Sequence, residues 1–397
     1  MPAPLTGLRA LVSGGGVAGP ALAYWLARYG ADTTVVELAP APRTGGFAVD
    51  FRGPTHLGVL ETMGVLDELR ALQTHGGAMS WVDEHDREIF RLPEAFAGGD
   101  LEVRRRDLGR VLYEAAADRV DYRFSDTVTA LAETADGVHV DFARSASGVY
   151  DLVVGADGLH SKVRALAYGP ERDYVRHLDY YLAGWDLPND VGAGAVPRLY
   201  NVPGRMASVS APLADGPATA MAVLASPRID HDWHDTERQR RIVTDAFTGL
   251  GWHVPALLEG LRTAPDLYFD AICRVAVPKW TTRRTALLGD AAWGVTLGGM
   301  GVGTGVVGAY VLAGELAAAG GDTAAALAAY ERRMRPYAGR WQRGANPGRF
   351  LAPATRRGLW LRDAMFKRAL VRNMLVASTG SLAEDAGLPD YPALVAA

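Results

Sequence analysis

Four short stretches of this chain hold residue types that could bind a dinucleotide. The first is GGGVAG at positions 14–19, which follows a short apolar strand and fits the G-x-G-x-x-G pattern. Glycine permits a tight turn at Gly14, the close approach of a diphosphate at Gly16, and close helix–strand packing at Gly19. Nicotinamide and flavin enzymes share this loop, so the loop alone does not say which nucleotide it holds.

The residues behind the loop narrow the ligand. A helix begins with Val17 and Ala18, and its free N–H groups and positive dipole end favour phosphate groups. Glu37 ends the next strand, just before Leu38. An acid at this place accepts hydrogen bonds from a ribose 2′-hydroxyl and would repel a 2′-phosphate. The pattern therefore predicts FAD or NAD, and not NADP.

The other three stretches place charged residues at the ends of predicted elements. The run Arg104-Arg105-Arg106-Asp107 lies at the start of a helix predicted from Glu102. The start of a helix is the positive end of its dipole, so cations are unfavourable there unless an anion lies nearby. Asp157-Gly158 and Gly289-Asp290 each close an apolar strand, and α/β sheets bind ligands at such strand ends. The alternative for the arginine run is a solvated basic face, and the alternative for each aspartate is an ordinary polar turn without a ligand.

The elements that must position these residues alternate between strand and helix. Apolar spacing predicts strands at 8–13 and 32–38, with a helix between them that ends at Gly30. Further strands are predicted at 122–124, 128–132, 138–142, 149–156, 268–277 and 285–288. Between 178 and 226, short alternating runs separated by Pro, Gly and Asp predict an antiparallel sheet inserted into the first unit. A helix is predicted over 236–262 and a glycine-rich loop over 294–305, and Asp322 or Thr323 is expected to cap an Ala-rich helix.

Composition excludes several classes of protein. The 397 residues are 49% apolar and 22% charged with a net charge of −4, which indicates a soluble protein without a nucleic-acid or membrane partner. The single cysteine, Cys273, excludes an internal disulfide framework and a thiolate zinc cluster. No export signal is visible, so we expect a cytoplasmic monomer or homodimer.

Other residues are weaker candidates. His231 and His234 have a metal-ligand spacing, but a solvated helix start is the favoured interpretation because no third ligand lies nearby in the sequence. Asp270 and Arg274 are possible polar anchors. The predicted middle sheet carries large apolar side chains, some in its core and some facing a substrate cavity: Tyr181, Trp185, Tyr200, Met206, Met221 and Phe269. We add Phe47 and Trp293 to the residues that could touch a substrate.

Taken in order, these motifs resemble the single-component FAD-dependent aromatic monooxygenases of the para-hydroxybenzoate hydroxylase group. The chain looks most like the tetracycline-inactivating monooxygenases and actinobacterial enzymes that act on natural products. The resemblance rests on GGGVAG, Glu37, Arg-x-Asp-Leu at 105–108, GADGLHSKVR and LLGDAA, between residues 7 and 320. It implies resident FAD, NADH or NADPH as a transient reductant, and O2. A flavin C4a-hydroperoxide would then hydroxylate an aromatic or polyketide-like small molecule.

The resemblance also assigns roles. Gly14, Gly16 and Gly19 would hold the diphosphate and Glu37 the adenosine ribose. Arg105 would contact the phosphate or ribityl chain, and Asp290 would hydrogen-bond the ribityl chain. Asp157 would serve FAD and the nicotinamide. The remaining expected cofactor contacts are Val17, Ala18, Leu38, Arg43, Arg52, Val128, Gly158, Gly299, Met300 and Gly301.

The implied fold class is α/β, with a Rossmann-like FAD-binding domain, an inserted mixed or antiparallel sheet domain and C-terminal helices. FAD-binding segments are expected at 1–75, 101–175 and 279–345, substrate segments at 76–100 and 176–278, and a helical segment at 346–397. The resemblance implies no catalytic side chain, because the cofactor carries the oxygen chemistry.

One departure leaves alternatives open. Relatives usually continue GDAA with His or Tyr and a proline-containing turn, whereas this chain has Trp293 and no proline through Gly305. The altered loop leaves a flavin dehydrogenase or oxidase and a non-catalytic FAD-binding module as alternatives. A Baeyer–Villiger oxygenase is a further alternative because it would use the same motifs. A flavin-dependent halogenase is disfavoured because no two tryptophans are two residues apart.

Overall fold

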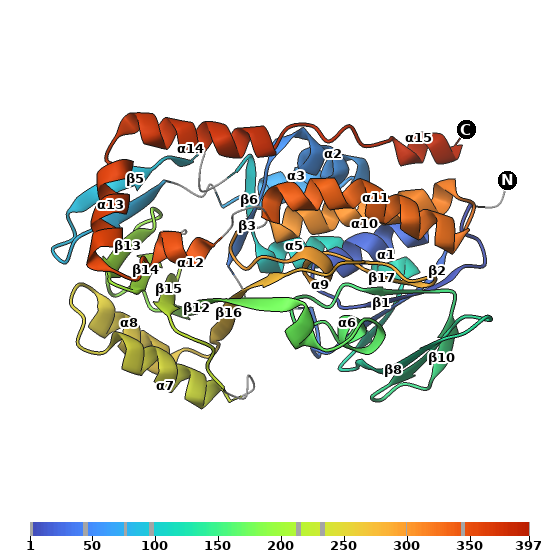
Figure 1. Ribbon diagram of the computed structural model, residues 1–397, viewed down its shortest axis with the longest axis horizontal. Coiled ribbons are helices and arrows are strands. Elements are labelled where there is room, and N and C mark those ends of the chain that lie inside the picture. Colours follow the sequence, from blue (N-terminus) through green and yellow to red (C-terminus); the bar gives the residue numbers. More distant parts are fainter. Residues whose placement is uncertain are drawn as a thin grey trace.

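The computed structural model describes residues 3–42, 47–74, 78–94, 99–211, 216–230, 235–298, 300–342 and 346–396. Four residues of the sequence analysis, Arg43, His231, His234 and Gly299, lie outside these ranges. The described chain forms two main sheets that lie side by side, with helices of the C-terminal region running over both (Figure 1).

The first main sheet is parallel and has five strands in the order β17-β11-β1-β2-β7. Its strands are β1 (Arg9–Ser13), β2 (Asp32–Glu37), β7 (Asp121–Phe124), β11 (Leu152–Gly155) and β17 (Thr285–Leu287). Helices α1 (Ala18–Arg28), α5 (Arg105–Glu114), α10 (Gly301–Ala318) and α11 (Thr323–Gln342) lie over one side of it (Figure 1). Helix α6 (Lys162–Ala167) packs against β11 from the other side (Figure 1), and this covering of both faces explains why β11 is apolar and buried throughout.

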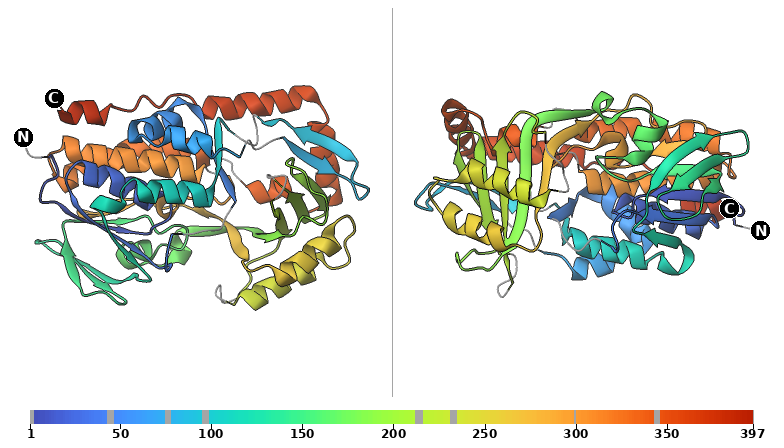
Figure 2. Two further views of the ribbon diagram at one scale, coloured as in Figure 1. Left: turned by 180° about the vertical axis from the view of Figure 1, so that it is seen from behind. Right: turned by 90° about the horizontal axis from the view of Figure 1, so that it is seen from below.

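The second main sheet has seven strands in the order β16-β12-β15-β14-β13-β4-β5. The strands are β4 (Met79–Val82), β5 (Glu88–Leu92), β12 (Val175–Leu187), β13 (Arg198–Val202), β14 (Arg205–Ser210), β15 (Ala218–Ala225) and β16 (Tyr268–Val275). All neighbours are antiparallel except β13 and β4. Helices α7 (Thr236–Phe247) and α8 (Val254–Thr263) cover one face, as Figure 2 shows from below.

Smaller elements join the two sheets. A two-stranded sheet, β3 (Ala48–Phe51) with β6 (Leu101–Arg104), lies between them, and a three-stranded sheet contains β8 (Val128–Glu133), β9 (Val138–Phe142) and β10 (Gly148–Tyr150). The remaining helices are α2 (Gly53–Met63), α3 (Leu66–Ala71), α6 (Lys162–Ala167), α9 (Asp290–Trp293), α12 (Pro347–Leu351), α13 (Arg356–Phe366), α14 (Ala369–Leu382) and α15 (Tyr391–Ala396).

The structure confirms the α/β fold class and most of the predicted strands, and it corrects four boundaries. Residues 101–104 form strand β6, so the helix predicted from Glu102 begins only at Arg105. The apolar run 149–156 is two strands in different sheets, because Asp151 turns away to accept from the backbone and side chain of Arg9. Residues 236–262 form two helices. Helix α10 begins at Gly301, inside the predicted glycine-rich loop.

One local prediction, a helix cap, is confirmed. Asp322 accepts from the backbone N–H of Ala325 at 3.1 Å and so caps α11. Helix α10 is long and apolar enough to cross a membrane, but 78% of it is buried inside the protein. It is therefore a core helix, and its length and composition do not indicate a membrane span.

Candidate functional site

The three motif glycines of the loop at residues 14–19 have different surroundings. Gly14 has φ +111°, and a Cβ there would lie 2.5 Å from the carbonyl oxygen of Ala156. A Cβ at Gly19 would lie 1.9 Å from the carbonyl oxygen of Gly14, so both positions are closed by packing. A Cβ at Gly16 would meet nothing within 4 Å. Gly16 therefore faces open space, as a position that approaches a ligand must.

Two helix N-termini meet at the carboxyl edge of the parallel sheet. A Cβ built at Gly289 or at Gly305 would lie 3.3 Å from the Cβ of Ala18, the first residue of α1. Because Gly305 lies in the second turn of α10, the starts of α1 and α10 are adjacent. Neither helix has a side-chain cap, so the N–H groups of both first turns are available to an anion. This donor set fits a diphosphate.

Glu37 holds the same loop from the neighbouring strand. Its carboxylate accepts from the backbone N–H of Gly15 at 2.6 Å and of Ala39 at 2.8 Å. The Glu37 side chain is buried, whereas the next residue, Leu38, is 57% exposed. A carboxylate oxygen can accept more than one hydrogen bond, so Glu37 could also accept from a sugar hydroxyl.

Asp157 organises the turn after β11. It accepts from the Ser161 hydroxyl, from the backbone N–H of Lys162 at 2.8 Å and from that of Val163 at 3.1 Å. Burial raises the pKa of Asp157 despite these hydrogen bonds. Gly158, with φ +79°, makes the turn that follows. Asp157 thus fixes the N-terminus of α6 while it lies beside the first glycine loop, where Ser13 is 3.4 Å away.

Asp290 occupies the equivalent place after β17. Gly289, with φ +64° and ψ −137°, turns the chain into α9, which begins with Asp290. A Cβ at Gly301 would lie 2.5 Å from Oδ1 of Asp290, so the start of α10 passes close to this carboxylate. Burial raises the pKa of Asp290, and the nearby Arg105 partly opposes that rise. The start of α10 and Arg105 of α5 therefore both lie near Asp290.

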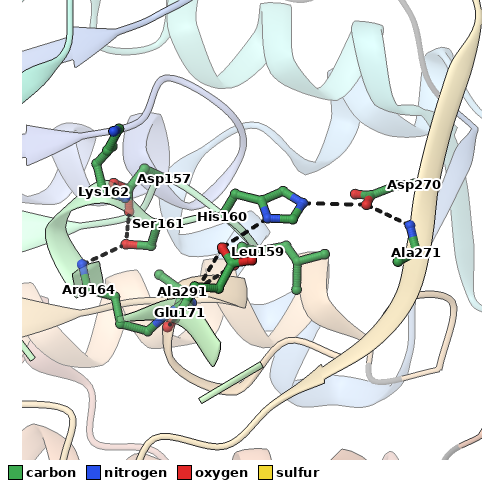
Figure 3. Close-up of polar contacts among 10 residues, drawn as sticks. All are labelled: Asp157, Leu159, His160, Ser161, Lys162, Arg164, Glu171, Asp270, Ala271 and Ala291. Atoms are coloured by element: carbon green, nitrogen blue, oxygen red, sulfur yellow. Dashed lines mark hydrogen bonds and ion pairs between the residues drawn. The ribbon is translucent and has the colours of Figure 1, made fainter. Parts of the chain in front are cut away.

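A charged cluster connects this region with the seven-stranded sheet (Figure 3). Nδ1 of His160 lies 3.0 Å from Oε2 of Glu171, and Nε2 lies 3.4 Å from Oδ1 of Asp270 on β16. These hydrogen bonds, to Asp270 first and then to Glu171, raise the pKa of His160 to about 10. Fully buried Arg164 lies 3.6 Å from Glu171 and donates to the carbonyl oxygen of Ala291 at 3.0 Å.

The glycine-rich loop after α9 docks on the same strand. The N–H of Val275 donates to the carbonyl oxygen of Gly294 at 2.8 Å. The N–H of Thr296 donates to the carbonyl oxygen of Cys273 at 3.1 Å, and its hydroxyl accepts from the N–H of Cys273 at 3.2 Å. The C-terminal end of strand β16 is therefore attached to the parallel-sheet side of the molecule.

The face of the seven-stranded sheet that carries Asp270 has a gap in its side chains at Gly184. Gly184 pairs with Tyr268 on one neighbouring strand and with Met221 on the other. A Cβ at Gly184 would lie 2.1 Å from Cζ of Phe47, whose ring meets Tyr268 edge-on at 5.8 Å. An aromatic ring thus packs directly on the backbone of β12.

The predicted substrate residues divide between the two faces of this sheet. Met206, Met221 and Phe47 belong to the cluster on the Gly184 face. Tyr181, Trp185, Tyr200 and Phe269 belong to the opposite cluster, beneath α7 and α8. Successive strand residues point to opposite faces, so side chains predicted as one lining cannot all share a cavity.

The four residues under α7 and α8 make core contacts. Tyr181 stacks on Phe269 with ring centroids 5.2 Å apart, and the indole N–H of Trp185 donates to the carbonyl oxygen of Leu257 at 3.1 Å. The structure therefore corrects their placement: they support the sheet from behind its Gly184 face.

Trp293 also lies elsewhere than predicted. It is 1% exposed within the core of the parallel-sheet side, and its indole N–H donates to the Thr304 hydroxyl at 3.0 Å. Its ring lies 4.6 Å from that of Trp280, and a Cβ at Gly308 would lie 3.0 Å from Cη2 of Trp293. Trp293 consequently ties α9 to α10 beneath the glycine-rich loop.

Three other predicted contacts have local roles. Arg52 donates from Nε to Asp50 at 2.7 Å, and its backbone N–H donates to Nδ1 of His56 at 3.0 Å. Val128 is fully buried at the start of β8. Met300 precedes α10 in a left-handed conformation, with φ +46°.

Sequence reasoning missed Gly184, His160 and His56. Gly184 had a signal, since a lone glycine in a strand pattern often marks a close approach. His160 stood within a quoted motif, but its partners are 11 and 110 residues away. His56 is 1% exposed and stacks on Trp341, a contact that no local pattern encodes.

Comparisons with known proteins agree with this geometry. The family model described as FAD binding domain matches residues 8–345. An uncharacterized protein of Mycobacterium tuberculosis is 38% identical over 339 residues, covering 84% of this chain and 91% of that protein. A flavin-dependent monooxygenase of Legionella longbeachae is 32% identical over 336 residues, covering 83% and 86%. The crystal structure of tetracycline destructase Tet(51) superposes with a TM-score of 0.80 at 28% identity, covering 97% of this chain and 99% of that one.

Proposed function

We propose a function from one premise: this chain belongs to the FAD binding domain family and is an FAD-dependent monooxygenase. The proposal is that it hydroxylates an apolar, aromatic or polyketide-like small molecule. NADH or NADPH would reduce the flavin, and O2 would supply the oxygen atom. The protein would act in the cytoplasm as a monomer or homodimer.

The proposed FAD site runs along the carboxyl edge of the parallel sheet. Its diphosphate would lie at Gly16, between the free N–H groups at the starts of α1 and α10. Glu37 would accept from the adenosine ribose, Asp290 would hydrogen-bond the ribityl chain, and Arg105 would bind the phosphate or ribityl chain. The other residues proposed to contact FAD are Gly14, Val17, Ala18, Gly19, Leu38, Arg52, Val128, Asp157, Gly158, Met300 and Gly301.

The proposed substrate site is the Gly184 face of the seven-stranded sheet. The observation that carries it is the bare backbone at Gly184, between Tyr268 and Met221, with the Phe47 ring packed on it. A surface that accepts one flat ring against its backbone can accept another, and its flanks are apolar. A planar, apolar substrate fits this chemistry better than a charged one.

The division of labour follows from that placement. FAD, when bound, would supply the oxygen-transfer chemistry, with O2 as the source of the oxygen atom and NADH or NADPH as the source of the electrons. The chain's own residues would bind the flavin, orient the substrate on the sheet and exclude water, because Phe47, Tyr268 and Met221 leave little polar surface there. No side chain of this face is required as a nucleophile.

Stopped-flow absorbance tests the proposal. FAD-loaded protein is photoreduced without oxygen and mixed with oxygenated buffer, alone and with tetracycline as the first trial ligand. A transient C4a-hydroperoxide spectrum before reoxidation is the expected result, followed by oxygenated product where the ligand is accepted. Direct return to oxidised flavin with release of peroxide, under varied pH and ligands, would contradict a monooxygenase function. Ring expansion in place of hydroxylation would assign the Baeyer–Villiger reaction instead.

A further inference from the structure

The C-terminal helices α13 and α14 carry an exposed surface that the proposed function does not use. Large apolar side chains protrude from them, with exposed fractions of 71% for Trp360, 54% for Leu361, 73% for Leu370 and 64% for Met374. Met365, at 44%, belongs to the same group. Such side chains are normal singly, but five within fifteen residues form a patch that indicates an interaction site.

The patch lies on the outer side of α13 and α14, whose inner sides pack against the core of the seven-stranded sheet. Leu361 and Met365, like Leu370 and Met374, are four residues apart and so share a helix face. On the inner side, Phe366 is 9% exposed in the core of the seven-stranded sheet. Val371 and Leu375 pack against that same core. Helix α14 runs along the edge of the molecule on the side of the seven-stranded sheet, with α13 at one end (Figure 1).

Basic residues lie close to these apolar residues in the sequence. Residues 356–382 contain six arginines and lysines and one acid, Asp363, although the whole chain carries a net charge of −4. Arg356, Arg357, Lys367 and Arg368 are exposed. Within the described part of the chain, no carboxylate forms an ion pair with any of these four. We name the five apolar and these four basic residues the α13–α14 face.

We propose that the α13–α14 face docks this enzyme onto a membrane that contains anionic lipids. Exposed Trp, Leu and Met beside unpaired Arg and Lys combine apolar insertion with attraction to a negative surface. The protein would lie on the bilayer and would not span it. A second copy of the chain is a poorer occupant, because an isologous contact would set these unpaired cations against one another. The described residues that follow α14 do not cover the face, since α15 packs through Tyr391 against Gly314 of α10.

Vesicle co-sedimentation of the FAD-loaded full chain tests this proposal, with phosphatidylcholine vesicles with and without phosphatidylglycerol. We expect binding to the vesicles that contain phosphatidylglycerol only, and loss of that binding in high salt. Lys367→Glu with Arg368→Glu should weaken binding at least about tenfold, since each basic residue adds about 1 kcal/mol near such a surface. Trp360→Ser with Leu370→Ser and Met374→Ser should abolish it.

Matched controls lie on other faces. Leu166→Ser removes an apolar side chain that is 40% exposed on α6, and Arg241→Glu reverses an exposed charge on α7. Both should bind vesicles as the unaltered protein does. Flavin absorbance and the thermal midpoint verify that every variant is folded.

Three results would overturn the proposal. One is the absence of binding to either kind of vesicle, and another is equal binding to both. The third is a concentration-dependent dimer in analytical ultracentrifugation that the apolar triple variant dissolves, which would assign the face to a second copy. None of these results bears on the stopped-flow test, so the docking surface and the proposed oxygenase can fail separately.

Discussion

Nε2 of His160 lies 3.4 Å from Oδ1 of Asp270, and this contact joins the turn after β11 to the edge strand of the seven-stranded sheet. The other ring nitrogen of His160 lies 3.0 Å from Glu171. An imidazolium between two carboxylates is a charge-assisted link between segments that are 110 residues apart. It fixes where β16 enters the region of the proposed active site.

This link predicts a pH-dependent contribution to stability. The pKa of His160 is raised from 6.5 to about 10, so its stabilising charge is fully present below pH 6.5 and lost as the pH rises to about 10. The ring is half exposed, so His160→Gln should lower the free energy of unfolding by only about 1 kcal/mol at slightly acidic pH. Urea unfolding of both proteins across this range should show the difference vanishing. The exposed His139→Gln is the control, and a difference that grows with pH would contradict the prediction.

The stability of the protein at acidic pH is expected to depend on His56. Burial first, and then the nearby Arg52, lower the pKa of His56 from 6.5 to about 4. The neutral ring therefore supports the fold above pH 6.5, and that support falls as the pH drops toward 4, by up to about 3 kcal/mol. His56→Phe removes the titration, so its unfolding free energy should change less over this range than that of the unaltered protein. Parallel pH curves for the two proteins would count against this role.

Gly16→Ala should separate binding from folding. Its Cβ would meet nothing within 4 Å, so the thermal midpoint of the apoprotein should stay unchanged. The methyl group would occupy space proposed for the diphosphate, and the FAD dissociation constant should rise at least about tenfold. Gly109→Ala, at an equally open position on α5, is the matched control. Flavin fluorescence titration of the apoproteins decides, and equal affinity for all three would refute the diphosphate position.

Gly184→Ala should affect the substrate side alone. The added Cβ would lie 2.1 Å from Phe47, so the ring must move off the sheet. We expect normal FAD content with ligand-stimulated NADPH oxidation reduced at least about tenfold, because a misplaced reactant loses most of its positioning advantage. Gly194→Ala, in open space, should behave as the unaltered protein. Unchanged stimulation in Gly184→Ala would show that the substrate binds elsewhere.

Trp293→Phe should reveal a structural role. The variant leaves the buried Thr304 hydroxyl without its indole donor and opens space beside Trp280. A cost of about 1–3 kcal/mol in unfolding free energy is expected. The Michaelis constant for an accepted substrate should change little, since Trp293 is 1% exposed in the core. A large change in that constant with normal stability would restore the contact that the sequence predicted.

The sequence by itself determined which residues gather at the proposed nucleotide-binding edge of the parallel sheet. GGGVAG, Glu37 and the aspartates at 157 and 290 are local signals, since each depends on the strand immediately before it. Parallel strands bring their carboxyl ends to one edge, so these signals were enough to place the residues together. These signals by themselves left FAD and NAD open, and the choice of FAD came from the family that the motifs resemble when taken in order.

Only the tertiary structure decided which face of the seven-stranded sheet is left for the proposed substrate site. Strand alternation shows which residues share a face, but which face meets the rest of the protein depends on what packs on each. Helices α7 and α8 pack on the Tyr181 face, so Gly184, Met221 and Tyr268 lie on the opposite face, which is the proposed substrate site. The same limit applied to Trp293, whose burial depends on α10 and Trp280, and to His160, whose carboxylate partners come from distant segments. Such long-range contacts arise from the packing of whole elements, and no local pattern in the chain records them.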